Sequence, residues 1–481
     1  MVRYAVLLAT AFLVPPLFAQ EPAKSNAQHL VDQTLAMHPD IAIMAMHVTP
    51  PQMKDNIIFA SNIGRFGKKA DSDDMKVING STNLEVNKAG DHFEVALPFL
   101  DASHKSIGAL SLVYPYKAGD DKAALAKRAV KVRDQLSQKI PNLASLVQPW
   151  QGSTLPMVST ADPNPTVKLA GRSKTWKPGY TGDFDHFGID LKGNRLFLAA
   201  EDHGTVELFN LKTGVHQSTL TGFQTPHAFI YLPEHNRLII TDSGKGMTKI
   251  LDATTLKIVG KIALEPGADS AEYDASTGHL YIVTGGKDVG MKNCFLNEVD
   301  PLTGKVYAKL KFDSDHTEAI KAEQHGNRLF VNVADHNEVA VVDKKTLKVI
   351  ANWPLSGAQT NLTMALDEAD HRLFVGTRNP SKLFVLNTDT GATIAMLDAP
   401  ATSDGLFYDS ARKRVYVPGG DGYLGVFQQV TPDLYAARPW IPSAHGAKSG
   451  LVVPELDRMY LAASPGEHGK GGDILWFKLN K

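Results

Sequence analysis

The sequence predicts an all-β fold of repeated units for residues 166–481, and three observations support this prediction. A unit of roughly forty residues returns seven times between Asp183 and Lys481. Within each copy, β-branched and aromatic residues alternate with other residues, as in RLFLAA from Arg195 and RVYVPG from Arg414. Turns rich in Asp, Gly, Asn and Thr separate these runs about every eight to twelve residues, which is typical of antiparallel strands.

The number of copies and the two ends of this region predict how the units assemble. One four-stranded unit cannot bury both of its faces alone, so the copies must pack face to face around an axis. Seven copies therefore predict a seven-bladed β-propeller. The last copy ends after its third strand, DILWFKLN from Asp473, and VKLAGRSKTW from Val167 is typical of a lone strand. We expect this lone strand to become the outer strand of the last blade and to close the ring.

Two of the copies carry a family resemblance. NRLFVNVADHNEVAVVDKKTLKVI from Asn327 and HRLFVGTRNPSKLFVLNTDTGATI from His371 resemble the repeat of the YVTN/YncE-like propeller family, a WD40-like repeat. The resemblance covers about two thirds of the chain. It implies the propeller fold and no particular activity, because repeats of this type occur in binding scaffolds and in enzymes.

The N-terminus and the composition predict the compartment and exclude some partners. Residues 1–19 are typical of a secretory signal peptide, with Arg3 before an apolar run and a cleavage site after Ala19. We therefore expect a periplasmic or secreted protein, and no later stretch is apolar enough for a membrane span. The net charge of −1 gives no basic excess for nucleic acid, and a single cysteine, Cys294, excludes an internal disulfide.

Residues 25–147 lack the repeat and predict a small α+β domain. Helices are expected at 26–38, at 72–78 with Ser72 as the N-cap, and at 121–140; strands are expected at 41–48, 56–63, 84–90, 92–101 and 106–116. Residues 148–165 are rich in Pro, Ser, Thr and Gly, and they predict a semi-rigid linker that permits independent motion of the two domains.

The order of these elements, together with LPFLDASHKSIGALSLVYP from Leu97, resembles the PAS-like Cache modules of bacterial sensors. The resemblance implies a small-molecule site in the cup of the sheet. Its candidate residues are Asn62, Arg65, Lys68, Lys69, Asp71 and Asp101. The alternative is that the charged run 65–74 is a solvated loop without a ligand.

Alignment of the seven copies places one residue per blade at the start of the innermost strand, around the mouth of the central channel. These candidates are Asp185 with the adjacent His186, His227, Asp269, Glu318, Asn361, Asp404 and Lys448. Carboxylates that converge raise each other's pKa, and a bound Ca²⁺ or Mg²⁺ would offset their charge. The alternative is a polar ring that holds ordered water. Loops on the same face add Asp202–His203 and 335–337.

The leading functional prediction is a non-catalytic exported protein. Its propeller would bind a small molecule or a protein partner, and its Cache-like domain would bind a small molecule; the oligomeric state stays open. The alternative is a metal-dependent hydrolase that opens lactones. In that case Asp269, Glu318, Asn361 and Asp404 would hold the cation, and His186 or His227 would act as the base.

Overall fold

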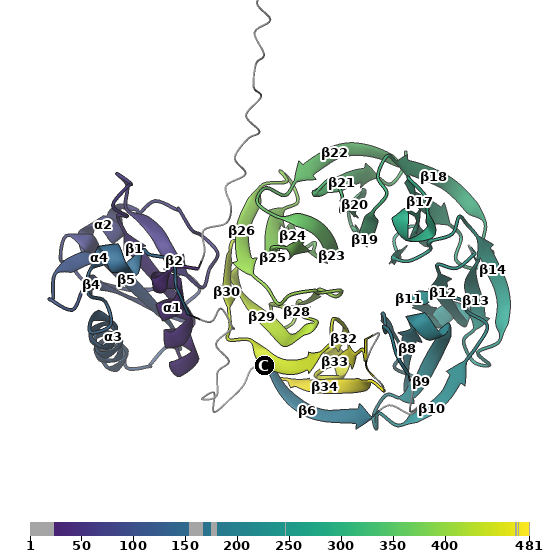
Figure 1. Cartoon of the computed structure of the whole chain (residues 1–481), viewed down its shortest axis with the longest axis horizontal. Coiled ribbons are helices and arrows are strands. Elements are labelled where there is room, and N and C mark those ends of the chain that lie inside the picture. Colours follow the sequence, from purple (N-terminus) through teal and green to yellow (C-terminus); the bar gives the residue numbers. More distant parts are fainter. Residues whose placement is uncertain are drawn as a thin grey trace, which may run out of the picture.

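The structure is a computed structural model that describes residues 24–152, 167–174, 180–245, 247–466, 469 and 471–480. A small N-terminal unit, residues 24–152, lies beside a ring of sheets (Figure 1). The predicted signal peptide and most of the predicted linker fall outside the described residues and stay predictions. Among the helices that are described, none has the length and apolar character to cross a membrane.

Within the described residues, seven antiparallel sheets form the ring, and we number them as blades 1 to 7 (Figure 1). Blade 1 contains β7 (Phe187–Asp190), β8 (Arg195–Ala200), β9 (Thr205–Asn210) and β10 (His216–Leu220), and blade 2 contains β11 (Pro226–Leu232), β12 (Arg237–Asp242), β13 (Met247–Asp252) and β14 (Ile258–Ala263). Blade 3 contains β15 (Ala271–Asp274), β16 (His279–Gly285), β17 (Cys294–Val299) and β18 (Val306–Phe312), and blade 4 contains β19 (Thr317–Ala322), β20 (Arg328–Val333), β21 (Glu338–Asp343) and β22 (Lys348–Pro354). Blade 5 contains β23 (Gln359–Asp367), β24 (Arg372–Asn379), β25 (Ser381–Asn387) and β26 (Thr393–Asp398). Blade 6 contains β27 (Phe407–Asp409), β28 (Arg414–Pro418), β29 (Asp421–Thr431) and β30 (Leu434–Ala437), and β31 (Ile441–His445) also pairs with β29. Blade 7 contains β32 (Ser449–Val453), β33 (Arg458–Ala463), β34 (Asp473–Leu479) and β6 (Val167–Lys174). The described connections contain four short 3-10 helices, η1 (Glu201–His203), η2 (Pro233–His235), η3 (Lys287–Val289) and η4 (Pro454–Leu456).

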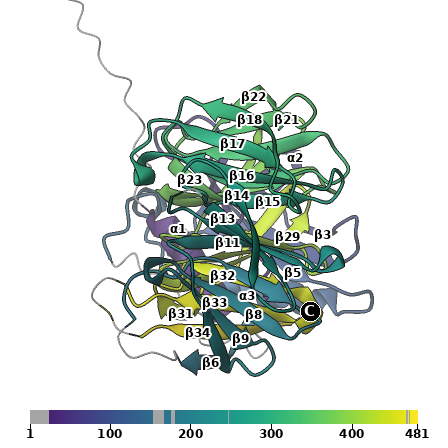
Figure 2. The same ribbon diagram turned by 90° about the vertical axis from the view of Figure 1, so that its right-hand side faces the viewer.

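The ring is closed in two ways. The innermost strands β7, β11, β15, β19, β23, β27 and β32 contact one another in this order, and β32 contacts β7. At the seam, β6 pairs antiparallel with β34, with Arg172 opposite Leu475 and Val167 opposite Leu479. The closing strand predicted from the sequence is therefore present. Seen from its rim, the ring presents β14 and β18, and the N-terminal unit lies behind it and is partly visible (Figure 2).

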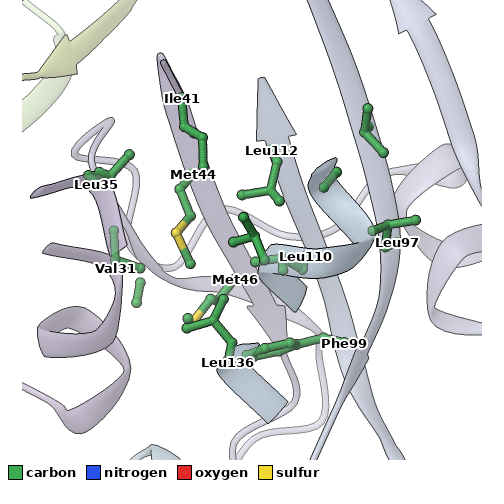
Figure 3. Packing of buried hydrophobic residues seen from close by; sticks show 14 of the residues in the cluster. Val31, Leu35, Ile41, Met44, Met46, Leu97, Phe99, Leu110, Leu112 and Leu136 are labelled. Carbon is green, nitrogen blue, oxygen red and sulfur yellow. The ribbon is translucent and has the colours of Figure 1, made fainter. Parts of the chain in front are cut away.

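The N-terminal unit follows the predicted order of elements. It contains α1 (Asn26–Met37), β1 (Ile43–Val48), β2 (Ile57–Ser61), α2 (Ser72–Ile78), β3 (Asn83–Val86), β4 (His92–Leu100), β5 (Ser106–Pro115), α3 (Lys122–Ser137) and α4 (Leu143–Leu146), with the sheet order β2-β1-β5-β4-β3. Its core packs Met44 and Met46 of β1, Leu110 and Phe99 against the helices, for example against Leu136 (Figure 3).

Two details of this unit differ from the prediction. The N-cap of α2 is Asp71 and not Ser72, because the Asp71 carboxylate accepts hydrogen bonds from the backbone N–H groups of Asp73 and Asp74. The Asp74 carboxylate in turn accepts from the Asp71 N–H, which completes a capping box. Helix α4 was not predicted, because four residues are too few to show a helical period.

The two units are packed against each other, although a linker of the predicted composition would permit independent motion. Ala42, Ile43, Ile58 and Ile63 form an apolar cluster with Ala436 of β30. Backbone groups join the units as well. The Ala437 N–H donates to the Asn62 carbonyl at 2.8 Å, and the Asn62 side chain donates to the Ala437 carbonyl at 3.0 Å. The N-terminal unit is therefore docked on the outer strand of blade 6.

Candidate functional site

The predicted candidates lie where the innermost strands begin, and three of them, from neighbouring blades, approach one another. Asp185 precedes β7, His227 is the second residue of β11, and Asp269 precedes β15. The His227 Nδ1 atom lies 2.6 Å from Asp185 Oδ2 and 3.7 Å from Asp269 Oδ1. Packing of blades 1, 2 and 3 around the axis brings these side chains together. We call this end of the ring the mouth.

His227 is held on both sides of its ring. Its Nε2 atom lies 3.0 Å from the hydroxyl of Ser243, opposite the bond to Asp185. Burial alone would lower the pKa of His227, but Asp269, Asp185 and Glu201 raise it to about 10. The order Ser243–His227–Asp185 follows that of a nucleophilic triad, yet a charged imidazole cannot accept the serine proton. His227 therefore acts here as a cation that orders the carboxylates.

Burial and mutual repulsion shape the protonation of the carboxyl groups at the mouth. Burial opposes ionisation of Asp185, but His186, His227 and Lys448 outweigh it and hold the pKa of this carboxyl well below its usual range. Burial, with Glu318 and Asp185 adding to it, raises the pKa of Asp269 to about 7. Asp185 therefore stays ionised at neutral pH, whereas Asp269 is protonated in part.

Glu201 is a site residue that the sequence alignment missed. It lies in η1, directly after β8, and burial together with Asp185 raises its pKa to about 8. The only feature of the sequence that pointed to Glu201 was its position directly before Asp202–His203, the loop pair predicted to lie on the face of the mouth.

Among the described residues, two groups of three place metal-ligating atoms within 4.8 Å of one another. The first contains Asp185, His186 and Asp269, and the second contains Asp185, Glu201 and His227. Asp185 belongs to both. Imidazole nitrogen and carboxylate oxygen are both ligands of divalent transition metals. This donor set differs from the all-oxygen ring expected from the sequence.

Three of the four residues in the predicted metal set Asp269, Glu318, Asn361 and Asp404 bind other protein groups in the structure. Glu318 lies 2.8 Å from His316 Nε2. The buried Asn361 donates to Asn332 Oδ1 and to the Glu338 carbonyl, both at 2.8 Å.

Asp404, the last of the four, lies in an ion-pair network at the other side of the mouth. It pairs with Arg378 at 3.0 Å and with Lys448 at 3.3 Å, and Lys448 also pairs with Asp183 at 2.8 Å. The two sides of the mouth therefore differ. On the side of blades 5 to 7, Asp404 is paired with fixed cations, whereas blades 1 to 3 bring together carboxyl groups whose pKa values are raised by burial and mutual repulsion.

The candidates of the N-terminal unit do not form one cup. Asn62 is buried at the contact with the ring, where its Oδ1 accepts from the Met44 N–H, and Arg65 donates to the Asp433 carbonyl of the ring. Asp71 is the helix cap described above. Lys68 is exposed, and Lys69 pairs with Asp55 at 2.7 Å.

Asp101 differs from the other N-terminal candidates because it lines a cavity of about 570 Å³. Lys105 and Asn142 line the same cavity. One carboxylate oxygen of Asp101 accepts hydrogen bonds from the N–H groups of Ser103 and Lys105, so the residue also fixes a turn.

Comparison with known proteins addresses the fold. No family model matches the chain, and no curated protein matches it. Among solved structures, 1447 chains match. One, from "Crystal Structure of Mitotic Checkpoint Complex", has a TM-score of 0.54 and 14% identity, and the match covers 70% of this chain and 99% of that chain. The ring is a β-propeller. At this identity the match shows the fold of the propeller alone, and the function has to be argued from the site.

Proposed function

We propose that the propeller is a binding platform, and that its ligand presents a positively charged group to the mouth at blades 1 to 3. One observation carries the proposal: Asp185 and Glu201 of blade 1 and Asp269 of blade 3 converge there. A lysine or arginine side chain of a protein partner would lower the pKa of Asp269 and Glu201 and would pair with their ionised forms. Partly buried carboxylates pair more strongly with such a group than exposed ones do.

Binding of a lysine-rich peptide tests this function. We expect a fluorescent hexalysine peptide to bind the full chain in EDTA and to bind about tenfold more weakly to an Asp269→Asn variant, because a charge pair is lost. The matched control is Glu234→Gln. Glu234 is an exposed carboxylate in η2, at the opposite end of the strands of blade 2. Equal affinity of the two variants, or equal binding of a hexaglutamate peptide, would contradict the proposal.

A metal-dependent hydrolase is the second candidate function, and the convergence of His186 with Asp185 and Asp269 favours it. Asp185 and Asp269 would hold a cation that polarises a lactone or ester carbonyl. Because His227 is charged, it would supply a hydrogen bond and not a base. Lactone hydrolysis that depends on added divalent ion and disappears in Asp185→Asn would support this candidate.

We also propose that the chain is exported, on the strength of the predicted signal peptide at residues 1–19. N-terminal sequencing of the mature protein tests this, since a first residue of Gln20 is expected. A mature chain that retains residues 1–19 would contradict it.

The N-terminal unit is proposed as a PAS/Cache-like small-molecule module. Its order of elements matches the predicted one, and its cavity at Asp101 has the size of a small-ligand site. A thermal-shift screen against small metabolites tests this. We expect a compound that raises the melting temperature of the wild type and does not raise that of Lys105→Met. If the screen finds no such compound, the proposal is contradicted.

A further inference from the structure

At the mouth, one nitrogen of His186 and one oxygen of Asp185 lie as far apart as two atoms that ligate the same metal ion. His186 Nε2 lies 3.5 Å from Asp185 Oδ1, which is longer than a normal hydrogen bond. Around an ion with bonds of about 2.0–2.2 Å, neighbouring ligand atoms lie roughly 3–3.6 Å apart. The third atom of this group belongs to Asp269, and all three lie within 4.8 Å of one another.

His227 orients the carboxylate at the centre of this group. Its Nδ1 binds Oδ2 of Asp185 at 2.6 Å, and its Nε2 is fixed by the Ser243 hydroxyl at 3.0 Å. The other carboxylate oxygen, Oδ1, is the one that faces His186. Residues that fix the orientation of a ligating side chain in this way are typical of metal sites. Glu201, in the second group with Asp185, lies close enough to supply a further oxygen.

We propose that Asp185, His186 and Asp269 bind one divalent transition-metal ion, with Zn²⁺ or Mn²⁺ as the fitting class. The imidazole in the set favours these ions over Ca²⁺ and Mg²⁺, which prefer oxygen ligands alone. This inference rests on the proposed function, because the ion would itself be the positively charged group that the mouth binds, or it would occupy the mouth together with a charged ligand. The three side chains come from blades 1 and 3, so the ion would also join two blades that lie on either side of β11.

Titration of the metal-free full chain with ZnCl₂ by calorimetry tests the site. We expect one tight ion per chain in the wild type, and at least tenfold weaker binding in His186→Gln and in Asp269→Asn. His186 and Asp269 have side chains that are 32% and 36% exposed, so these variants should fold, and circular dichroism checks that they do. His279→Gln is the matched control, because His279 begins β16 at the opposite end of blade 3 from the mouth, and its side chain, 33% exposed, pairs with Glu298 outside both groups. Its affinity for Zn²⁺ should equal that of the wild type.

A second measurement keeps the two proposals apart. The electron paramagnetic resonance signal of Mn²⁺ should fall on addition of the wild type and should remain with His186→Gln. No tight ion in the wild type, or equal binding by wild type and both ligand variants, would overturn the metal site. If the hexalysine peptide still binds in EDTA under those conditions, the binding platform stands while the metal site falls. If the ion binds and the peptide does not, the metal site stands and the binding platform falls.

Discussion

Replacement of Lys344 by methionine is expected to lower the free energy of unfolding by about 3–5 kcal/mol, because it leaves a buried carboxylate without its cation. Lys344 Nζ lies 2.8 Å from Asp274 Oδ2, and the two side chains are 3% and 0% exposed. Asp274 ends β15 of blade 3, and Lys344 follows β21 of blade 4. The pair therefore links two blades, and its loss should loosen their packing.

Urea denaturation followed by tryptophan fluorescence measures this effect. Lys345→Met is the matched control, since Lys345 is the exposed neighbour in the same turn and should change stability by less than about 0.5 kcal/mol. The double variant Asp274→Asn, Lys344→Met should regain part of the loss, because the unpaired charge is then removed. Similar midpoints for Lys344→Met and Lys345→Met would show that the pair does not hold the blades together.

The fold of the ring was predictable because its signals are local and repeated. Alternation within runs such as RLFLAA and the regular turns specify strands, and repetition specifies radial packing. The closing strand at Val167 followed from the missing fourth strand of the last copy. Each of these arguments uses residues that are close in the sequence or equivalent between copies.

The site was predictable only in part because its pairings depend on how the blades face one another. The alignment placed Asp185, His227 and Asp269 at the mouth, but it gave Asn361 the same role, although this side chain is buried against Asn332. Glu201 was missed because it lies outside the aligned position. Asn62 was expected to bind a ligand, and its partner is the backbone of Ala437, 375 residues away in the sequence. Nothing local in the sequence marks such a contact.

That contact leads to the second large effect, at Gly64. We expect Gly64→Val to separate the N-terminal unit from the ring. Gly64 has a φ of 62°, and a Cβ atom there would lie 2.4 Å from the backbone carbonyl oxygen of Met396 in β26. A backbone group cannot move aside as the end of a side chain can, so the two units must shift apart. Small-angle scattering should show a larger radius of gyration, and limited proteolysis should release a stable ring.

Gly67→Val separates the effect of the clash from the effect of backbone strain. Gly67 also has a positive φ, 84°, but nothing lies within 4 Å of its Cβ position. This variant should therefore keep the two units docked, even if the strained backbone lowers the stability of its own loop. If Gly64→Val scatters like Gly67→Val, the apolar cluster of Ile43, Ile58 and Ala436 must tolerate a shift of this segment. If only Gly64→Val opens the molecule, docking depends on close backbone approach at one residue, and the N-terminal unit has a fixed position relative to the mouth.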